Sequence, residues 1–353
     1  MHKYMIDQQP TFKAFVTLGS FLRDFCNDPA ETSEWKSRLR DGIRLARQQN
    51  KWFTEENVHF ALQNWGDLLT ETKLTTWLQA YDVNATSLGT PKTVALIMAG
   101  NIPLVGLHDF LCILLTGNKA LCKLSSNDSA LITFIADYLI HVEPSLESKI
   151  EFKEGTINGF EAVIATGSNN TARYFEHYFG KVPHIIRKNR NSVAVLSGKE
   201  STAQLKGLGQ DVFRYFGLGC RSVSKLFVPK SYDFDLFFKA IYAFHPIVNE
   251  LKYGNNYDYN KAVYLMSEYL LKDNGFLLLK EDTGYASPIA CLFYEYYENA
   301  AALETRLSQD REQLQCIVSD GFPMESVGFG ETQKPSLDDY ADGVDTVDFL
   351  LKI

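Results

Sequence analysis

The feature that most constrains the fold is a continuous apolar run, TVALIMAG, at residues 93–100. A run of this length without a charge is typical of a strand buried on both faces, as the strands of parallel sheets are. The apolar character continues to residue 117, but Asn101, Pro103 and Asp109 interrupt it. Polar groups are costly in the middle of a bilayer, and the Asn-Ile-Pro sequence would break a helix. We therefore expect a strand, a turn and a buried helix over 93–117, and no membrane span.

Strands and helices are predicted to alternate after this run. Strand-like segments recur between segments with helical spacing, at 119–125, 161–167, 184–189, 192–198 and 224–229. Such alternation predicts a mostly parallel, doubly wound sheet, in which ligands bind beyond the carboxyl ends of the strands. The turns that follow residues 100, 125 and 167 are therefore candidate binding sites. Further strands at 276–280, 289–297 and 314–319 predict a second α/β unit, while residues 10–82 have helical spacing with breaks at 27–30 and 50–55.

Composition excludes several classes of function. The 353 residues are 45% hydrophobic and 22% charged, which is ordinary for a folded protein, and the net charge of −8 does not favour a nucleic-acid partner. The six cysteines show neither CxxC spacing nor a cluster with histidines, so no metal site is expected. The amino terminus lacks the pattern of a secretion signal, and a cytoplasmic location with reduced thiols is predicted.

Cys220 is the first candidate for chemistry. It lies in RYFGLGCRSVSKLFVP, residues 214–229, between a glycine-rich turn and a short apolar strand. A cysteine in a soluble protein is most often a small buried apolar side chain. Here Gly217 and Gly219 leave room for a substrate, and the guanidinium of Arg221 would favour the reactive thiolate. From the local residues alone, the core interpretation and the nucleophile interpretation are balanced.

Three strand ends carry further candidates, each with a structural alternative. Asn101, in AGNIPL, belongs to a turn that starts a helix, or donates a hydrogen bond to an oxyanion. Lys123 extends its stem along an apolar surface, or meets a phosphate or a ribose. Gly167 and Ser168, in ATGSNN, form a helix-capping turn, or bind a phosphate. The basic residues Arg187, Lys188 and Arg190 form a cluster, which is either a solvated edge or a contact for a coenzyme A phosphate.

The order of these motifs carries a resemblance. Asn-x-Pro-Leu at 101–104, Gly-Asn-x-x-x-x-Lys at 117–123, Thr-Gly-Ser at 166–168 and Gly-x-Gly-Cys at 217–220 follow one another along the chain. Together they resemble the aldehyde dehydrogenase superfamily, and most of all its acyl-CoA reductase branch, typified by the fatty-acid reductase of bacterial luminescence. The resemblance is good over residues 90–230 and looser elsewhere.

The resemblance implies a fold and a division of the chain. The fold class is α/β and aldehyde-dehydrogenase-like, with two doubly wound α/β domains and N-terminal helices. The implied ranges are an N-terminal helical segment at 1–85, a dinucleotide-binding domain at 86–210, a catalytic domain at 211–320 and a C-terminal segment at 321–353. Relatives usually pair through the catalytic domain, so a homo-oligomer, either a dimer or a tetramer, is expected.

The resemblance also implies site residues. Cys220 matches the nucleophile, and Asn101 matches the residue that helps to stabilise the oxyanion. Lys123 matches the lysine that contacts the adenosine ribose of the cofactor, in a turn that also contains Ser125 and Ser126. Gly167 and Ser168 match the turn beside the cofactor pyrophosphate.

Three departures from the family pattern refine the expected reaction. Relatives that hydrolyse their thioester carry a general-base Glu, but residues 187–198 contain no acid, which favours acyl exchange with coenzyme A over hydrolysis. Ser126 stands where NAD-preferring relatives have a Glu, which favours NADPH and leaves NADH possible. In the segment 282–290 the pair Ser287-Pro288 fits the family motif, but Gly284 replaces its Glu, so no ribose contact is assigned there.

The predicted function is reduction of an acyl-CoA, with a fatty acyl chain expected, to the aldehyde. NADPH supplies the hydride, Cys220 carries the acyl group, and coenzyme A is the leaving group. The first alternative is an acyl-phosphate reductase of the same fold, which also lacks the general base. The alternative from another class is a non-catalytic member that binds partners or lipids.

Overall fold

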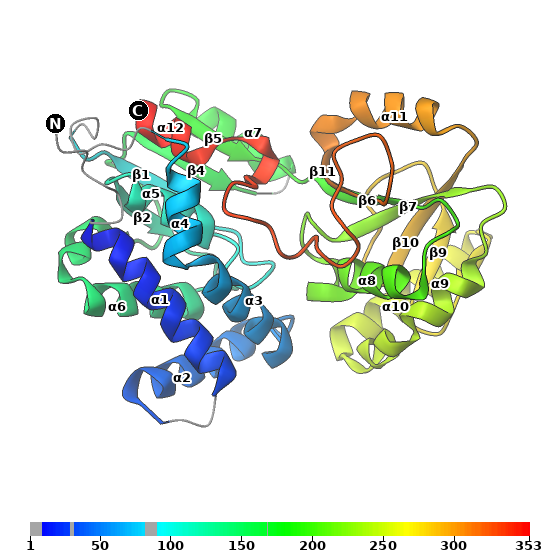
Figure 1. The fold of residues 1–353 in the computed structure, drawn as a ribbon, viewed down its shortest axis with the longest axis horizontal. Coiled ribbons are helices and arrows are strands. Elements are labelled where there is room, and N and C mark those ends of the chain that lie inside the picture. The colour runs from blue at the N-terminus through cyan, green and yellow to red at the C-terminus, as the bar shows by residue number, and fades with distance from the viewer. Residues whose placement is uncertain (1–8, 29–31, 82–89, 168) are drawn as a thin grey trace. The chain divides into compact units, whose positions relative to one another are not determined.

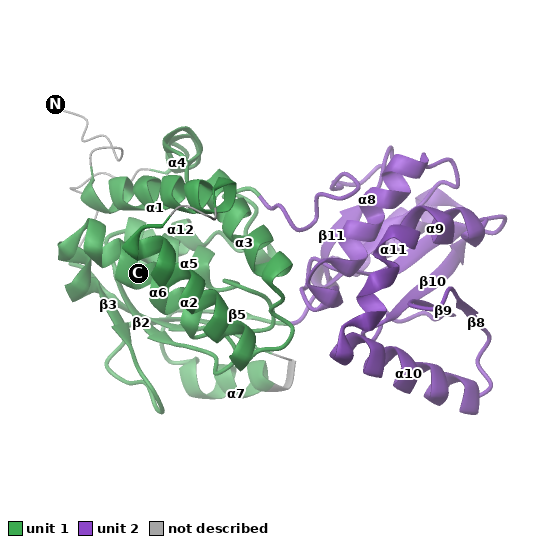
Figure 2. Cartoon of the chain, turned by 90° about the horizontal axis from the view of Figure 1, so that it is seen from below, with its two compact units in different colours: residues 1–188, 336–353 green, residues 189–335 purple. Residues whose placement is uncertain are grey.

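The computed structural model describes residues 9–28, 32–81, 90–167 and 169–353. They form two compact units, residues 1–188 with 336–353 and residues 189–335, each built around its own sheet (Figures 1 and 2). Both sheets are largely parallel and carry helices on both faces, which confirms the predicted α/β class. Among the described residues no helix is long and apolar enough to cross a membrane.

The first unit begins with helices, as predicted. They are α1 (Pro10–Asn27), α2 (Glu34–Gln49), α3 (Glu55–Leu68) and α4 (Glu71–Leu78). The side chains of Ser33, Thr54 and Thr70 each accept a backbone amide at a helix start, and these caps explain where α2, α3 and α4 begin. The breaks predicted at 27–30 and 50–55 fall between α1 and α2 and between α2 and α3.

The sheet of the first unit contains five parallel strands. They are β1 (Thr93–Ile97), β2 (Lys119–Lys123), β3 (Ile150–Phe152), β4 (Ala162–Thr166) and β5 (His184–Arg187), and their spatial order is β3-β2-β1-β4-β5. The connections contain α5 (Leu107–Leu115), α6 (Ala130–Val142), the 3-10 helix η2 (Pro144–Lys149) and α7 (Asn169–Phe179). The strand order reverses between β1 and β4, which are hydrogen-bonded neighbours. In such sheets ligands bind beyond the carboxyl ends at this reversal.

Alternate residues of β1 pack into different cores, as the strand period of two requires. Val94 and Leu96 join the large core formed with α1–α6, whereas Ala95 joins a smaller one on the other face with Phe175 and Phe179 of α7. The two faces are visible in Figure 2, where α7 lies across the sheet from the other helices. Burial on both faces explains why the run at 93–100 contains no charged residue and only one polar side chain, Thr93.

The sheet of the second unit contains six strands in the order β11-β6-β7-β10-β9-β8. They are β6 (Asn191–Val195), β7 (Val223–Pro229), β8 (Leu271–Asp273), β9 (Leu278–Glu281), β10 (Cys291–Tyr297) and β11 (Leu314–Val318). All pairs are parallel except the pair of β8 with β9. The helices are α8 (Thr202–Phe213), η3 (Arg214–Gly217), α9 (Phe234–Ile241), η4 (Tyr242–Asn249), α10 (Leu251–Met266), α11 (Ala300–Gln309) and η5 (Arg311–Gln313).

The compact units do not follow the ranges expected from the sequence. The segment 189–210 belongs to the second unit, because β6 pairs with β7 and β11 rather than with β5. The tail at 336–353 belongs to the first unit, where η6 (Ala341–Gly343) and α12 (Thr346–Lys352) follow one another and α12 packs on α5. The chain therefore passes from the first unit to the second after residue 188 and returns to the first after residue 335.

Two helix boundaries differ from what the local residues suggest. Asn127 is a plausible cap for the helix after β2, but α6 begins at Ala130 with Ser129 in the capping position. Apolar spacing would continue the helix that follows Ser201 as far as Phe216, but α8 ends at Phe213. Ser201 does cap this helix, since Ser201 and Gln204 form a reciprocal capping box.

A buried ion pair ties the tail to the first sheet. Arg187, at the end of β5, donates to both carboxylate oxygens of Asp109 on α5, at 2.6 and 3.2 Å. It also donates to the hydroxyl of Thr346 on α12, at 2.9 Å. Burial alone would raise the pKa of Asp109, but the guanidinium beside it outweighs that effect and lowers the pKa. The pair therefore joins α5, β5 and α12 through buried side chains.

We predict that Asp109→Asn lowers the free energy of unfolding by about 3 kcal/mol, because it leaves the Arg187 charge buried without its carboxylate. Glu176→Gln is the matched control, since it removes a carboxylate from the exposed pair with Lys188, and its effect on stability should be much smaller. Urea denaturation of the two variants measures both values. Equal losses would contradict a structural role for the buried pair.

Candidate functional site

The turn after β1 carries Asn101, whose side chain is exposed at the carboxyl end of the sheet. Two contacts fasten this turn from either side. Asn50, at the end of α2, donates to the Gly100 carbonyl at 3.1 Å, and Asp128 accepts the Leu104 amide at 2.9 Å. Leu104 has a φ of +59°, a left-handed conformation that costs a residue with a side chain roughly 1–3 kcal/mol. The turn is therefore held in a strained conformation.

The turn after β2 lies against the turn after β1. Lys123 is the last residue of β2 and is half-buried, Ser125 is also half-buried, and Ser126 is exposed. A Cβ atom on Gly100 would lie 2.5 Å from the Ser125 hydroxyl oxygen, so only glycine permits this approach. The structure thus brings the predicted oxyanion residue and the predicted ribose turn to the same end of the first sheet.

Asp128 closes the turn after β2 and was not singled out from the sequence. Its amide donates to the Ser125 carbonyl at 3.1 Å, while its carboxylate reaches back to Leu104. Burial raises the pKa of Asp128 to about 7, and the Leu104 amide only partly offsets this. The sequence contains one indication of this role, since Asp128 is an acid shortly after an apolar strand. An acid at such a position is equally typical of a helix cap, so the sequence alone does not single it out.

The turn after β4 contains Gly167, whose amide donates to the Arg187 carbonyl at 3.3 Å. A Cβ atom there would lie 3.0 Å from both Phe175 and Thr171, so the missing side chain lets α7 approach the strand end. Ser168 lies outside the described residues. Because β1 and β4 are neighbours, the turns of Asn101 and Gly167 flank the reversal of strand order.

In the second unit, Cys220 is exposed on the turn that precedes β7. All six cysteines lie among the described residues and none forms a disulfide; Cys26 is half-buried and the other four are buried. Burial raises the pKa of Cys26 to about 11 and that of Cys291 to about 12, which keeps those thiols protonated. Because Cys220 is exposed, it is not a side chain of the apolar core, and its exposure is consistent with the nucleophile interpretation.

The chain before Cys220 takes an unusual path. Tyr215, Phe216 and Gly217 all have left-handed conformations, with φ values of 54°, 59° and 76°. Both aromatic side chains are nevertheless buried, and the Phe216 ring contacts Tyr253 with centroids 6.2 Å apart. The packing of these rings offsets the strain of the left-handed backbone. This path ends α8 early and turns the chain so that Cys220 emerges at the surface.

Ser192 fixes the backbone of Cys220 and was also missed from the sequence. Its fully buried hydroxyl donates to the Cys220 carbonyl at 2.9 Å and accepts the Cys316 amide at 3.1 Å. Arg221, expected to act on Cys220, donates to the Cys316 sulfur at 3.3 Å. Ser192 lies on β6, Cys220 and Arg221 lie on the turn before β7, and Cys316 lies on β11. These segments are far apart in the sequence and become neighbours only in the folded sheet. No pattern within one segment could have indicated them.

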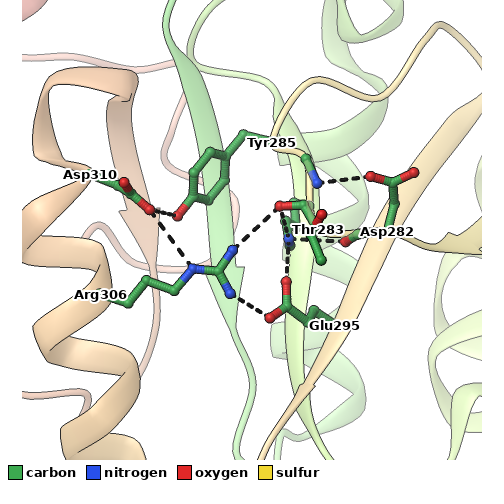
Figure 3. A network of polar contacts seen from close by, with 8 residues as sticks. Asp282, Thr283, Tyr285, Glu295, Arg306 and Asp310 are labelled. Atoms are coloured by element: carbon green, nitrogen blue, oxygen red, sulfur yellow. Dashed lines mark hydrogen bonds and ion pairs between the residues drawn. The ribbon is translucent and has the colours of Figure 1, made fainter.

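A polar network fastens residues 282–285, the segment where the family motif has its Glu (Figure 3). Lys225, fully buried on β7, donates to the carbonyls of Asp282 and Thr283 at 3.0 and 2.9 Å and to the Glu295 carboxylate at 2.7 Å. Arg306 contacts Glu295 from α11, as Figure 3 shows. Every member is satisfied by its neighbours, so the network holds the loop in place.

Arg187 is the most buried residue of the basic cluster at 187–190, and it fits neither a solvated edge nor a phosphate site. Arg187 is used by the pair with Asp109 described above. Lys188 pairs with Glu176, and Arg190 donates to the Leu314 carbonyl at 3.3 Å. The Arg187 guanidinium is therefore not available for the coenzyme A contact that was considered for this cluster.

Comparison with solved structures establishes the class of fold. An indole-3-acetaldehyde dehydrogenase complexed with NAD+ matches with a TM-score of 0.61 and 14% identity, over 89% of this chain and 72% of that one. Aldehyde dehydrogenase 21 from Physcomitrella patens, in complex with succinate, matches with a TM-score of 0.61 and 11% identity, over 97% and 87%. An NAD+ complex of a Mycobacterium tuberculosis aldehyde dehydrogenase matches with a TM-score of 0.60 and 12% identity, over 88% and 73%. The fold is that of the aldehyde dehydrogenases.

The family is more specific. The model of the acyl-CoA reductase (LuxC) family matches residues 41–237, which is more than half of the chain, and the chain belongs to this family. The resemblance inferred from the motifs is thereby confirmed. Membership places the protein among the oxidoreductases of aldehyde and acyl-CoA chemistry. A comparison with curated proteins gave no match.

We predict a pH-dependent difference in stability between the wild type and Asp128→Asn. The folded pKa of about 7 lies above the unfolded value of about 3.9, so the stability that Asp128 contributes is complete below pH 4 and is lost as the pH rises through 7. Between pH 5 and pH 8 the wild type should lose roughly 2.5 kcal/mol relative to the variant. Urea denaturation at both pH values measures this, and Asp41→Asn, which removes an exposed carboxylate, controls for the lost charge. A constant difference would show that Asp128 stays ionised.

Proposed function

We propose that this protein reduces an acyl-CoA thioester to an aldehyde through an acyl group carried on Cys220. The observation that carries the proposal is the exposure of this one cysteine on a glycine turn, in a chain of the acyl-CoA reductase family. The Cys220 thiolate attacks the acyl carbonyl, and its carbon–sulfur bond forms as the bond to coenzyme A breaks. The departing thiolate takes a proton and leaves as coenzyme A.

The residues of this chain have distinct roles in the proposal. Asn101 donates a hydrogen bond to the oxyanion that forms at each addition to the acyl carbon. Ser192 holds the Cys220 backbone so that the thiolate presents itself at the surface of the turn. After reduction, the thiohemiacetal on Cys220 collapses, which releases the aldehyde and restores the thiol.

A nicotinamide cofactor fits the residues at the strand ends of the first unit. When bound, it supplies the hydride that reduces the thioester. Lys123, Ser125 and Ser126 are assigned to its adenosine ribose, and Gly167 and Ser168 to its pyrophosphate. The strand order supports this assignment, because the turns after β1 and β4 flank the reversal at which such sheets bind nucleotides. The solved relatives include NAD+ complexes, which supports the choice of cofactor class.

The preference for NADPH rests on Ser126. Ser126 is exposed and uncharged, so it does not repel a 2′-phosphate as a Glu at this position would. Lys123, at the end of β2, supplies a positive charge nearby in the sequence. The homo-oligomer, the fatty acyl chain and the cytoplasmic location stay predictions from the sequence.

We predict that Cys220→Ala lowers kcat for acyl-CoA reduction by at least about 10³-fold, because no other group then carries the acyl chain. Cys26→Ala, which removes a half-buried thiol, should retain activity. The loss of NADPH absorbance measures turnover, and mass spectrometry of the enzyme mixed with acyl-CoA alone detects the adduct on Cys220. Reduction of an acyl phosphate but not of acyl-CoA would favour the other reductase. Turnover without Cys220 would overturn the mechanism.

We predict that Ser126→Glu shifts cofactor preference from NADPH toward NADH. The introduced carboxylate repels a 2′-phosphate and accepts hydrogen bonds from free ribose hydroxyls, so the ratio of kcat/KM for NADPH over NADH should fall by about 10-fold or more. Ser126→Gln, of similar size but uncharged, separates charge from bulk. An unchanged ratio in Ser126→Glu would remove Ser126 from the cofactor site.

A further inference from the structure

Asp128 connects two turns that the proposed reaction uses separately. Its backbone belongs to the turn after β2, where its amide donates to the Ser125 carbonyl and the Asn127 amide donates to the Ser125 hydroxyl at 3.2 Å. Its side chain belongs to the turn after β1, through the hydrogen bond from Leu104. One residue thus spans the ribose turn and the oxyanion turn.

The two turns approach each other closely. A Cβ atom on Gly100 would meet the Ser125 hydroxyl oxygen at 2.5 Å and the Asp128 amide nitrogen at 3.1 Å. The end of α2 closes the assembly from outside, because Asn50 bonds to the Gly100 carbonyl and Gln49 accepts the Ser129 hydroxyl at 3.3 Å. These contacts couple the positions of the two turns.

The Asp128 carboxylate is the contact that holds the strained residue. Leu104 is 2% exposed and left-handed, and its buried amide needs an acceptor in that conformation. Asp128 is 4% exposed and supplies the acceptor through Oδ2. The other carboxylate oxygen, Oδ1, is buried and has no hydrogen-bond partner among the described residues. Asp128 is thus a buried acid with one carboxylate oxygen lacking a partner, and its other oxygen supplies the hydrogen-bond acceptor that the Leu104 amide needs.

We infer that Asp128 is a positioning residue for Asn101: its carboxyl group locks the Asn101–Leu104 turn to the Ser125–Asp128 turn, so that the oxyanion donor and the cofactor turn are set as one body. The inference rests on the proposed function, in which Asn101 stabilises the oxyanion. An oxyanion donor works only when it is held close to its productive position, and a displacement of about 1 Å costs on the order of 100-fold in rate. Release of Leu104 lets the turn relax from its left-handed conformation and carries Asn101 with it.

Two substitutions separate the hydrogen bond from the mere presence of a side chain. Asp128→Ala removes the acceptor, and we expect kcat to fall by about 10-fold or more while KM for acyl-CoA changes by less than about 3-fold. Asp128→Asn keeps an acceptor for the Leu104 amide and resembles the protonated carboxyl group, so kcat should stay within about 3-fold of the wild type. Rates are divided by the number of active sites, titrated by labelling of Cys220.

A double-mutant cycle tests whether Asp128 acts through Asn101. If it does, Asp128→Ala combined with Asn101→Ala should be no slower than Asn101→Ala alone. Thr346→Val is the control for a structural effect, because it removes a buried hydroxyl beside Arg187 and Asp109 and should lower stability without lowering kcat per active site. Multiplicative losses in the cycle, or a wild-type kcat in Asp128→Ala, would overturn the inference.

Amide hydrogen exchange gives a readout that does not require turnover. The Leu104 amide should exchange at least about 10-fold faster in Asp128→Ala than in the wild type, and Asp128→Asn should retain most of the protection. If the wild type reduces no acyl-CoA, the proposed function fails while the exchange data still decide whether the lock exists. Unchanged protection in Asp128→Ala would show that the lock does not exist.

Discussion

The close approach of Gly100 to the turn after β2 is the constraint on which the candidate site of the first unit depends. With no side chain at this position, two strand-end turns occupy adjoining space, and Asp128 bridges them. Adjacent parallel strands place their carboxyl ends at one edge, but that alone leaves the turns free to move. Steric contact, a hydrogen bond to a strained residue and a clamp from α2 together remove this freedom. The N-terminal helices, which carry no recognisable motif, thereby take part in shaping the site.

The second unit solves the same problem by different means. Cys220 is exposed, so packing of its own side chain cannot position it. The buried rings of Tyr215 and Phe216 instead hold the preceding backbone in a left-handed path, and Ser192 holds the carbonyl of Cys220 itself. In both units a strained backbone is thus fixed by buried groups close in sequence to an exposed side chain that we propose takes part in the reaction. Rigid support beneath an accessible group is the arrangement that a covalent mechanism requires.

The sequence predicted those parts of the structure that depend on local pattern. The strand at 93–97 followed from an apolar run, and the start of α8 followed from a capping serine. The partner of Arg187 could not be predicted, because Asp109 lies 78 residues away and only the sheet brings the two together. Phe216 shows a related limit: its apolar spacing fits a helix, whereas in the structure it has a left-handed conformation with its ring buried. Asp128 and Ser192 were missed because their partners come from other strands.

The segment 187–198 links the fold to the choice between hydrolysis and acyl exchange. A hydrolytic enzyme needs a base to activate water, and this segment contains no acid. The structure shows what its residues do instead. Arg187 neutralises Asp109, Arg190 bonds to the Leu314 carbonyl, and Ser192 bonds to Cys220. Replacement of any of these by a general base would disturb the packing of a sheet or the turn of Cys220. These residues have structural roles, which supports the proposal that an acyl group leaves Cys220 by reduction rather than by attack of water.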